Sequence, residues 1–336
     1  MTVAEEVLAT AASWNVDGPV AMATVVSTTG SAPRTPGAAM AVSTDGAVVG
    51  SVSSGCIESA LYELCQESLR TGEAGLHRFG AGDGFYVVGP TCGGEIEVLV
   101  QRLERDDLTG HAGAVESGES VTVETVLEHP DPTRVGTRRL VSSSARRRTV
   151  GVRTFVQTWA SRPRLLVFGA SDFAAALADV GRALGRDVTV CDARPVFTTP
   201  ERFPSAHRVV VDRPDRYLHD EIAAGRVDDR TAVCVLTHDA RFDVPALLVA
   251  LRARLGYVGA MGSRRTHADR LERLLAAGVT RDDLVRLRSP IGLDLGARTP
   301  EEVALSIVAE IVADHRGAES VPMSRRTPPR SVASVG

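Results

Sequence analysis

The chain has 336 residues, a length typical of two domains of ordinary size, and its apolar fraction of 43% and charged fraction of 24% are those of a soluble globular protein. The formal net charge of −4 provides no field that would attract nucleic acid or anionic lipid. No apolar run in the sequence reaches about 18 residues, which excludes a membrane span. The acidic N-terminus lacks the basic and apolar regions of a signal peptide, so we expect a cytoplasmic protein.

The sequence contains no lysine and few cysteines, and both facts exclude particular kinds of site. All 38 basic side chains are arginines, which excludes a Schiff-base lysine and a P-loop lysine. Any bound anion must therefore be held by arginine forks, helix N-termini or backbone N–H groups. The five cysteines are odd in number and widely spaced, which predicts neither a disulfide framework nor a structural zinc site.

The first half of the chain mixes predicted helices and strands. Apolar residues at helical spacing predict a helix over 3–14, and a continuous apolar run predicts a buried strand over 20–26. Two prolines and two glycines within 28–37 predict a shaped loop. The remaining expected elements are a hairpin of 39–42 and 47–49 around Thr44-Asp45-Gly46, a helix over 57–69, strands over 95–100 and 120–127, and a charged surface hairpin over 138–149.

The pattern changes after Ser161-Arg162-Pro163 to short apolar strands that alternate with helices. Such alternation predicts a parallel sheet covered by helices on both faces. Residues 299–302 carry a clear signal for the N-terminus of a helix. Thr299 is the expected N-cap, Pro300 fits the first helical position, and Glu302 completes a capping box with Thr299. The expected strands are 164–168, 188–191, 208–211, 232–236 and 257–260, and the expected helices are 173–184, 244–255, 264–277 and 300–313.

We therefore expect an α/β protein with two domains. Residues 1–160 form an N-terminal mixed α/β domain, and residues 161–316 form a Rossmann-like, doubly wound parallel-sheet domain. From Gly317 onward the chain is rich in Ser, Pro and Arg and has no apolar periodicity, so 317–336 is predicted to be a disordered tail.

Two loops of small residues each carry one cysteine. Residues 50–58, Gly-Ser-Val-Ser-Ser-Gly-Cys-Ile-Glu, open a predicted helix, and residues 91–95, Thr-Cys-Gly-Gly-Glu, open a predicted strand. A thiol at a helix N-terminus lies at the positive end of the helix dipole, which favours the thiolate. Cys56 is therefore a candidate ligand for a soft metal and a candidate for sulfur transfer. The alternative, for Cys56 and for Cys92, is a small residue packed beneath its loop. The cysteines expected in the core are Cys65, Cys191 and Cys234.

A dinucleotide-binding fingerprint is only partly present at the start of the second domain. Residues 169–174, Gly-Ala-Ser-Asp-Phe-Ala, follow a strand and open a helix, and Asp192 lies about 20 residues further on. Gly169 is present, but Ser171 replaces the glycine that lets the backbone approach a pyrophosphate, and Ala174 replaces the third glycine. The position of this segment between a strand and a helix supports a Rossmann-like fold. Its residues leave open whether the domain binds NAD(P) or is a scaffold.

Three further segments lie at expected strand ends, where such sheets bind ligands. His238 follows the fourth strand and is a candidate acid or base, the alternative being a capping or surface histidine. The turn Gly262-Ser263-Arg264-Arg265 opens a helix with two arginines, which indicates a cradle for phosphate or carboxylate. Residues 289–298, Ser-Pro-Ile-Gly-Leu-Asp-Leu-Gly-Ala-Arg, are a shaped loop that we expect at the same crevice.

Taken together, these motifs resemble the XdhC/CoxI family, whose members mature molybdenum hydroxylases such as xanthine dehydrogenase. The last matching segment is long and highly specific. Two positions depart from the family pattern: Ser54 stands where a glycine is usual, and Gly169-Ala170-Ser171-Asp172 replaces a Gly-Ala-Gly-His turn, which bears on nucleotide binding and not on the fold. The matching segments are 30–37, 50–58, 92–94, 259–265 and 289–302.

The resemblance implies a molybdenum cofactor chaperone, a binding and delivery protein and not a turnover enzyme. Such a protein holds the cofactor, assists its sulfuration by a cysteine desulfurase and hands it to an apo-hydroxylase. The resemblance implies that Arg34 and the turn at Gly262 hold the cofactor phosphate and that Cys56 contacts molybdenum or carries sulfur. The full set of candidate cofactor-binding residues is Arg34, Ser53, Ser54, Gly55, Cys56, Glu58, Cys92, Gly93, Gly94, Gly169, Asp192, His238, Gly262, Ser263, Arg264 and Arg265.

Two alternatives assign other roles to the second domain. An NAD(P)-dependent oxidoreductase would bind its nucleotide there and use His238 as acid or base. An assembly scaffold would dock the hydroxylase with that domain and bind no ligand. A homodimer is compatible with every one of these hypotheses, and no nucleic-acid partner is expected.

Overall fold

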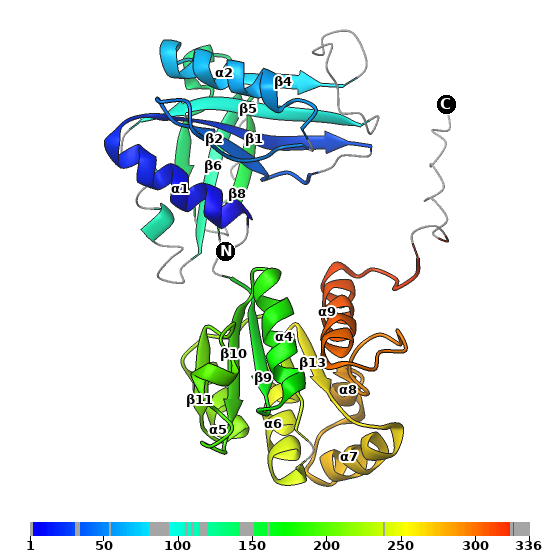
Figure 1. Ribbon diagram of the computed structural model, residues 1–336. Coiled ribbons are helices and arrows are strands. Elements are labelled where there is room, and N and C mark those ends of the chain that lie inside the picture. Colours follow the sequence, from blue (N-terminus) through cyan, green and yellow to red (C-terminus); the bar gives the residue numbers. More distant parts are fainter. Residues whose placement is uncertain are drawn as a thin grey trace, which may run out of the picture. The chain divides into compact units, whose positions relative to one another are not determined.

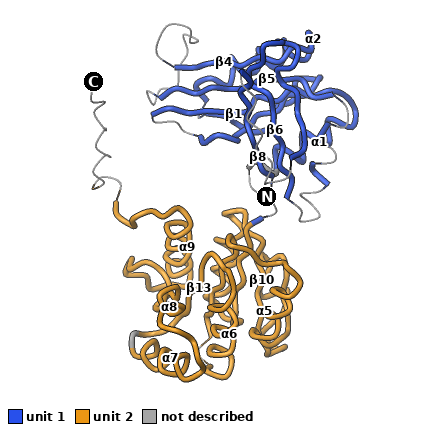
Figure 2. Tube along the Cα trace, turned by 180° about the vertical axis from the view of Figure 1, so that it is seen from behind, with its two compact units in different colours: residues 1–162 blue, residues 163–336 orange. Residues whose placement is uncertain are grey.

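The computed structural model divides into two compact units, residues 1–162 and 163–336 (Figures 1 and 2). Among the residues that it describes, no helix is long and apolar enough to cross a membrane. The described residues are 3–30, 34–53, 55–80, 94–104, 107–108, 111–113, 120–141, 151–159, 162–237, 239–322 and 325.

A five-stranded antiparallel sheet with a helix on each face forms the centre of unit 1 (Figure 1). Its elements are α1 (Val3–Asp17), β1 (Val20–Thr29), β2 (Ala39–Val42), β3 (Val48–Gly50), α2 (Glu58–Thr71), β4 (Gly75–Phe79) and β5 (Glu95–Leu103). The strand order is β3-β2-β1-β5-β4. Side chains of β1 alternate between the faces, so that Ala21 and Ala23 lie in the core beneath α2, and Met22 lies in the core beneath α1. Both faces of β1 are buried, which explains its continuous apolar sequence.

A second, three-stranded antiparallel sheet completes unit 1, in the order β7-β6-β8. Val123 of β6 and Trp159 of β8 join the same core as the buried side chains of α1. The strand β8 lies at an edge of this sheet. The bounds are β6 (Val121–Glu128), the short helix η1 (Pro132–Arg134), β7 (Arg138–Leu140) and β8 (Arg153–Trp159).

Unit 2 is a six-stranded parallel sheet in the order β11-β10-β9-β12-β13-β14 (Figure 1). The strands are β9 (Arg164–Phe168), β10 (Asp187–Asp192), β11 (Arg208–Val211), β12 (Ala232–Val235), β13 (Tyr257–Ala260) and β14 (Leu287–Arg288). The chain runs outward from β9 to β11 and then returns to β12 on the other side of β9. This reversal of strand order is the topological switch point of a Rossmann sheet, so the predicted fold class is confirmed.

Helices cover both faces of the parallel sheet. Their bounds are α4 (Asp172–Ala183), η2 (Pro200–Arg202), α5 (Pro214–Ala223), α6 (Ala240–Arg252), α7 (Arg264–Ala276), α8 (Arg281–Leu284) and α9 (Pro300–Arg316). Leu165 and Val167 of β9 lie in a core with α4 and α9, and Leu166 and Phe168 lie in a second core with α5, α6 and α7. The predicted capping box between Thr299 and Glu302 is present at the start of α9.

Candidate functional site

Loops that carry predicted site residues meet at one edge of the five-stranded sheet. Thr29, the last residue of β1, pairs with Glu95, the first residue of β5. The strand β2 begins and β3 ends at the same edge, because β2 pairs antiparallel with both β1 and β3. The register therefore places three segments at the same end of the sheet: the loop after β1 that holds Arg34, the loop after β3 that holds Cys56, and Gly94, which directly precedes β5.

The side chain of Glu58 folds back onto the loop that carries Cys56. Its Oε1 accepts a hydrogen bond from the Ser53 N–H at 2.8 Å and lies 2.7 Å from the Ser51 hydroxyl, and its Oε2 accepts from the Ile57 N–H at 3.3 Å. Burial alone would raise the pKa of Glu58, but the hydrogen bonds from Ser51 and from the backbone lower it. An ionised carboxylate of the chain itself therefore occupies donors on both sides of Cys56, beside the start of α2.

Cys56 lies two residues before α2 and not directly at its first turn. The helix begins at Glu58, and its N-cap residue, Ile57, supplies no side-chain hydrogen bond. Cys56 is half-buried and packs at the margin of the core beneath α2. The other described cysteines are buried, and burial raises the pKa of each thiol to about 12, which confirms their expected place in the core: Cys65, Cys191 and Cys234. Within the described part of the chain, Cys56 is the one partly accessible thiol.

A cavity of about 500 Å³, which we name the Arg34 cavity, lies between the loop after β1 and the edge strand β8. Residues 34–39, Ser51 and the consecutive residues 155–159 line it. Arg34 is exposed and forms no ion pair with a described carboxylate, and the described lining of the cavity contains no Asp or Glu. Ser51 belongs both to this lining and to the loop that Glu58 holds, so the cavity adjoins the loop of Cys56.

Some predicted site residues lie outside the described residues, so their assignments stay predictions. For Arg264 the structure describes the backbone but not the side chain. Ser53 is buried, and its hydroxyl has no hydrogen-bond partner among the described residues. The predicted site residues that are not described are Ser54, Cys92, Gly93 and His238.

The second candidate site is a crevice of about 760 Å³ at the switch point of unit 2. It is lined by the segments that follow β9, β10 and β12, so Gly169 and Asp192 lie where they were predicted. A Cβ atom on Gly169 would lie 3.0 Å from the Thr237 backbone nitrogen, and its φ is +116°, so only glycine fits this close approach of two strand ends.

The contacts of Asp192 do not suit a dinucleotide. One carboxylate oxygen accepts the Ala170 N–H at 2.8 Å, and both oxygens accept from the guanidinium of Arg194, at 2.8 and 2.9 Å. In addition, Ser171 caps α4 with its own hydroxyl, and Asp172 places an exposed negative charge in the first turn. The acceptor that would meet a ribose is thus engaged within the chain, and the helix N-terminus that would meet a pyrophosphate is capped by Ser171 and faced by an acid.

Two arginines of the crevice were missed by sequence reasoning. Arg194 pairs with Asp192, and Arg241 pairs with Asp239 through bonds of 2.6–3.1 Å. Each arginine follows its aspartate by two residues, a spacing that carries no specific signal in a sequence with 38 basic side chains. Because each charge is paired, the crevice holds no excess cation among these residues.

The turn at Gly262 and the loop 289–298 do not line this crevice. They follow β13 and β14, which lie beyond β12 in the sheet and away from the switch point. Ser263 caps α7 by accepting the Thr266 N–H at 3.2 Å. The residue that organises this region is Arg270, which is buried and donates to Ser289, Asp243 and the Met261 carbonyl; nothing in its charged helix distinguishes it in the sequence.

Comparison with known proteins decides the family. Residues 13–80 match the sequence model of the XdhC and CoxI family, and residues 165–311 match that of the XdhC Rossmann domain. The chain belongs to the XdhC and CoxI family. These two matches include the loops of Arg34 and Cys56, the switch-point crevice and the turn at Gly262.

The sequence alignments with individual relatives cover most of this chain. The molybdenum cofactor insertion chaperone PaoD of Escherichia coli is 29% identical over 293 residues, which cover 87% of this chain and 82% of PaoD. A Bacillus subtilis protein described as a probable subunit of xanthine dehydrogenase is 28% identical over 313 residues, which cover 87% of this chain and 92% of that protein. A crystal structure described as a xanthine dehydrogenase from Bacillus halodurans is 26% identical and has a TM-score of 0.75, covering 96% of this chain and 98% of that one.

The described residues contain no cluster of three or more His, Cys, Asp or Glu side chains placed to hold a metal ion. The predicted role of Cys56 as a metal ligand therefore rests on a single thiol. A metal that is already ligated by a carrier molecule needs no complete set of protein ligands, whereas a bare ion does.

Proposed function

We propose that this protein binds the molybdenum cofactor at the strand-end edge of unit 1, assists its sulfuration and delivers it to an apo-hydroxylase of the xanthine dehydrogenase or CO dehydrogenase type. A cysteine desulfurase is the second partner, and the protein acts as a carrier and not as a turnover enzyme. Membership of the XdhC and CoxI family and the relative named as a cofactor insertion chaperone support this function.

The observation that carries the proposal is the convergence of the Arg34 and Cys56 loops at one sheet edge. The cofactor has a phosphate at one end and a dithiolene-bound molybdenum at the other, so it needs an anion-binding group and tolerates a soft ligand. Arg34 offers a guanidinium that no described carboxylate pairs with, beside a cavity, and Cys56 offers a partly accessible thiol. In this assignment Glu58 holds the loop of Cys56 and does not contact the cofactor.

Cofactor retention tests this proposal directly. The full chain is incubated anaerobically with molybdenum cofactor and purified, and the co-eluting pterin and molybdenum are quantified for wild type, Cys56→Ser and the control Cys65→Ala. We expect near-stoichiometric retention by wild type and by the control, and a loss of retention in Cys56→Ser. Absence of retention by wild type would refute the carrier function, and unchanged retention by Cys56→Ser would refute the role of the thiol.

A nicotinamide nucleotide in the switch-point crevice is a second candidate, favoured by the Rossmann strand order alone. The contacts of Asp192 with Ala170 and Arg194 oppose it, because they occupy the acceptor that would meet a ribose. A fluorescence titration with NADH and NADPH tests it. Binding only near millimolar concentration would remove this candidate.

A further inference from the structure

The Arg34 cavity differs in charge from the crevice of unit 2. In the crevice, Arg194 and Arg241 are each paired with an aspartate. Among the described residues that line the Arg34 cavity, Arg34 alone is charged, and it has no described carboxylate partner. The other described lining side chains are neutral, so the described part of the cavity presents one uncompensated positive charge.

The cavity is also held in shape by the chain. Gly37 donates its N–H to the Val25 carbonyl at 2.8 Å, and the Val25 N–H donates to the Ala38 carbonyl at 2.9 Å. On the opposite side, Gln157 Nε2 donates to the Gly37 carbonyl at 3.1 Å. Gly37 has a φ of +96°, which a side chain would oppose. Gly37 and Ala38 are therefore tied to β1 and to β8, which holds this side of the cavity in place before any ligand arrives and lowers the cost of binding.

The carboxylate of Glu58 already occupies the backbone donors beside the start of α2, where an anion could otherwise bind. These donors are the N–H groups of Ser53 and Ile57. A second anion there would meet a fixed negative charge. An anionic ligand that approaches Cys56 is therefore drawn to Arg34, across Ser51, and not to the start of α2.

We propose that the Arg34 cavity is the subsite for the phosphate monoester end of a small ligand, whose other end extends past Ser51 toward the Cys56 loop. A guanidinium presents a planar fork of N–H donors that matches a phosphate in two-point contact. This assignment rests on the proposed function for the identity of the complete ligand. It adds to that function the site that surrounds the phosphate: a cavity whose other described lining residues are neutral, beside a glycine that is tied to β1 and to β8.

The two tryptophans of the chain allow phosphate binding in the Arg34 cavity to be measured directly. Trp159 lines the cavity, whereas Trp14 lies in α1 outside the lining. The indole N–H signals of the full ¹⁵N-labelled chain are followed by NMR during titration with inorganic phosphate at constant ionic strength. We expect phosphate to shift the Trp159 signal and not the Trp14 signal. Arg34→Ala is expected to weaken this binding at least tenfold, or about 1.4 kcal/mol.

The matched control is Arg70→Ala, which removes an exposed arginine of α2 in the same unit. It should leave the phosphate titration unchanged. A Trp159 signal that does not respond to phosphate, or that responds equally in Arg34→Ala, would overturn the subsite. Retained native chemical shifts elsewhere in Arg34→Ala separate loss of binding from loss of fold.

Cofactor retention by Arg34→Ala then separates the two proposals. Retention equal to that of wild type overturns the subsite and leaves the carrier function standing. If wild type retains no cofactor but phosphate binding depends on Arg34, the carrier function fails and the subsite stands. Loss of both phosphate binding and cofactor retention in Arg34→Ala supports both.

Discussion

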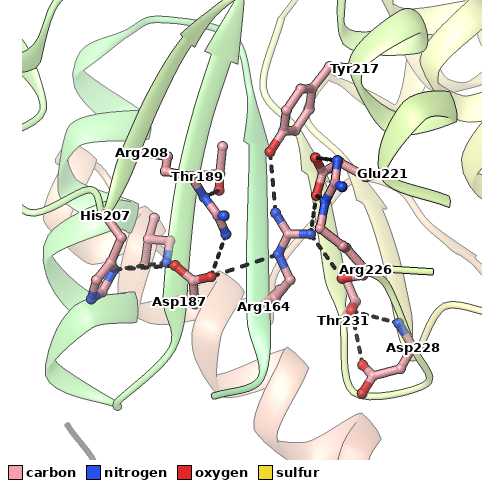
Figure 3. A network of polar contacts seen from close by, with 11 residues as sticks. Arg164, Asp187, Thr189, His207, Arg208, Tyr217, Glu221, Arg226, Asp228 and Thr231 are labelled. Carbon is pink, nitrogen blue, oxygen red and sulfur yellow. Dashed lines mark hydrogen bonds and ion pairs between the residues drawn. The ribbon is translucent and has the colours of Figure 1, made fainter. Parts of the chain in front are cut away.

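Arg164 and Glu221 form an ion pair in the interior of unit 2, at the amino end of the parallel sheet (Figure 3). Their exposed fractions are 8% and 5%. The guanidinium of Arg164 also donates to the Arg226 carbonyl at 2.9 Å and to the Tyr217 hydroxyl at 3.2 Å, and Asp187 lies 3.9 Å from its Nε. The first residue of β9 is thereby tied to α5, and this network lies at the end of the sheet opposite to the switch-point crevice.

Replacing one partner of this pair is expected to destabilise unit 2. In Glu221→Gln the charge of Arg164 stays buried and loses its main counter-ion, which typically costs about 3–5 kcal/mol. The measurement is the free energy of unfolding from urea titrations of wild type and variant. Glu272→Gln, on the exposed face of α7, is the matched control and should change the free energy by less than about 0.5 kcal/mol. Equal values for Glu221→Gln and the control would contradict this account.

The same pair predicts a dependence of stability on pH. Burial alone would raise the pKa of Glu221, but the hydrogen bonds and charges of Arg226 and Arg164 lower it from 4.5 to about 2. Because the folded pKa is depressed, the stabilisation is complete above pH 4.5 and is lost as pH falls from 4.5 toward about 2. The difference in unfolding free energy between wild type and Glu221→Gln should therefore be constant from neutral pH to about pH 5 and then shrink. A constant difference down to about pH 3 would tell against the lowered pKa.

Elements with strong apolar periodicity were predictable from the sequence, and weakly apolar ones were not. The continuous apolar run of β1 and the capping box of α9 are local signals, and the structure confirms both. The elements that were missed include β4, β8, α5, the short helix α8 and the edge strand β14. The strand β4, Gly75–Phe79, contains His and Arg, and α5, Pro214–Ala223, is mostly polar. Their structure depends on pairing and packing with distant segments, which single-sequence patterns do not encode.

For the candidate site, the sequence identified the loops but not their contacts. The small residues around Cys56 predicted a loop that meets a ligand, whereas the role of Glu58 depends on its side chain turning back to Ser53. The lining of the Arg34 cavity by β8 joins residues more than one hundred positions apart, such as Gly37 and Gln157. No periodicity or motif marks that pairing, so only the fold reveals it.

The accessibility of the thiols predicts their reactivity. Cys56 is half-buried, whereas Cys65, Cys191 and Cys234 are buried, and the pKa of each of these three thiols is raised to about 12. We expect iodoacetamide to modify Cys56 in the native protein and the three buried cysteines only after unfolding, because the thiolate is the nucleophile. Peptide mass mapping after timed alkylation measures this order. Labelling of the buried cysteines at the rate of Cys56 would be inconsistent with the structure.

Glu58 is expected to hold the loop of Cys56 in place. Glu58→Ala removes the acceptor of the Ser53 and Ile57 N–H groups, and hydrogen exchange of residues 51–57 should accelerate about tenfold or more, because each lost bond is worth about 1 kcal/mol. Glu58→Gln keeps one acceptor oxygen and should show a smaller effect. Glu63→Ala, an exposed glutamate of the same helix, is the control. Exchange in Glu58→Ala that matches this control would contradict the role of Glu58.

Two glycines, one at the end of β3 and one in the loop of Cys56, distinguish the cost of backbone strain from the cost of steric overlap. Gly50 has a φ of +86°, and a Cβ atom there would lie 2.4 Å from the Ala39 carbonyl oxygen. Gly55 has a φ of +103°, but a Cβ atom there would meet no atom within 4 Å. Gly55→Ala should therefore cost only the strain of a left-handed backbone, about 1–2 kcal/mol. Gly50→Ala should cost about 1–3 kcal/mol more, because the added methyl group forces β2 and β3 apart. Urea unfolding of both variants measures the two costs, and equal losses would mean that the approach of Gly50 to Ala39 is looser than the structure shows.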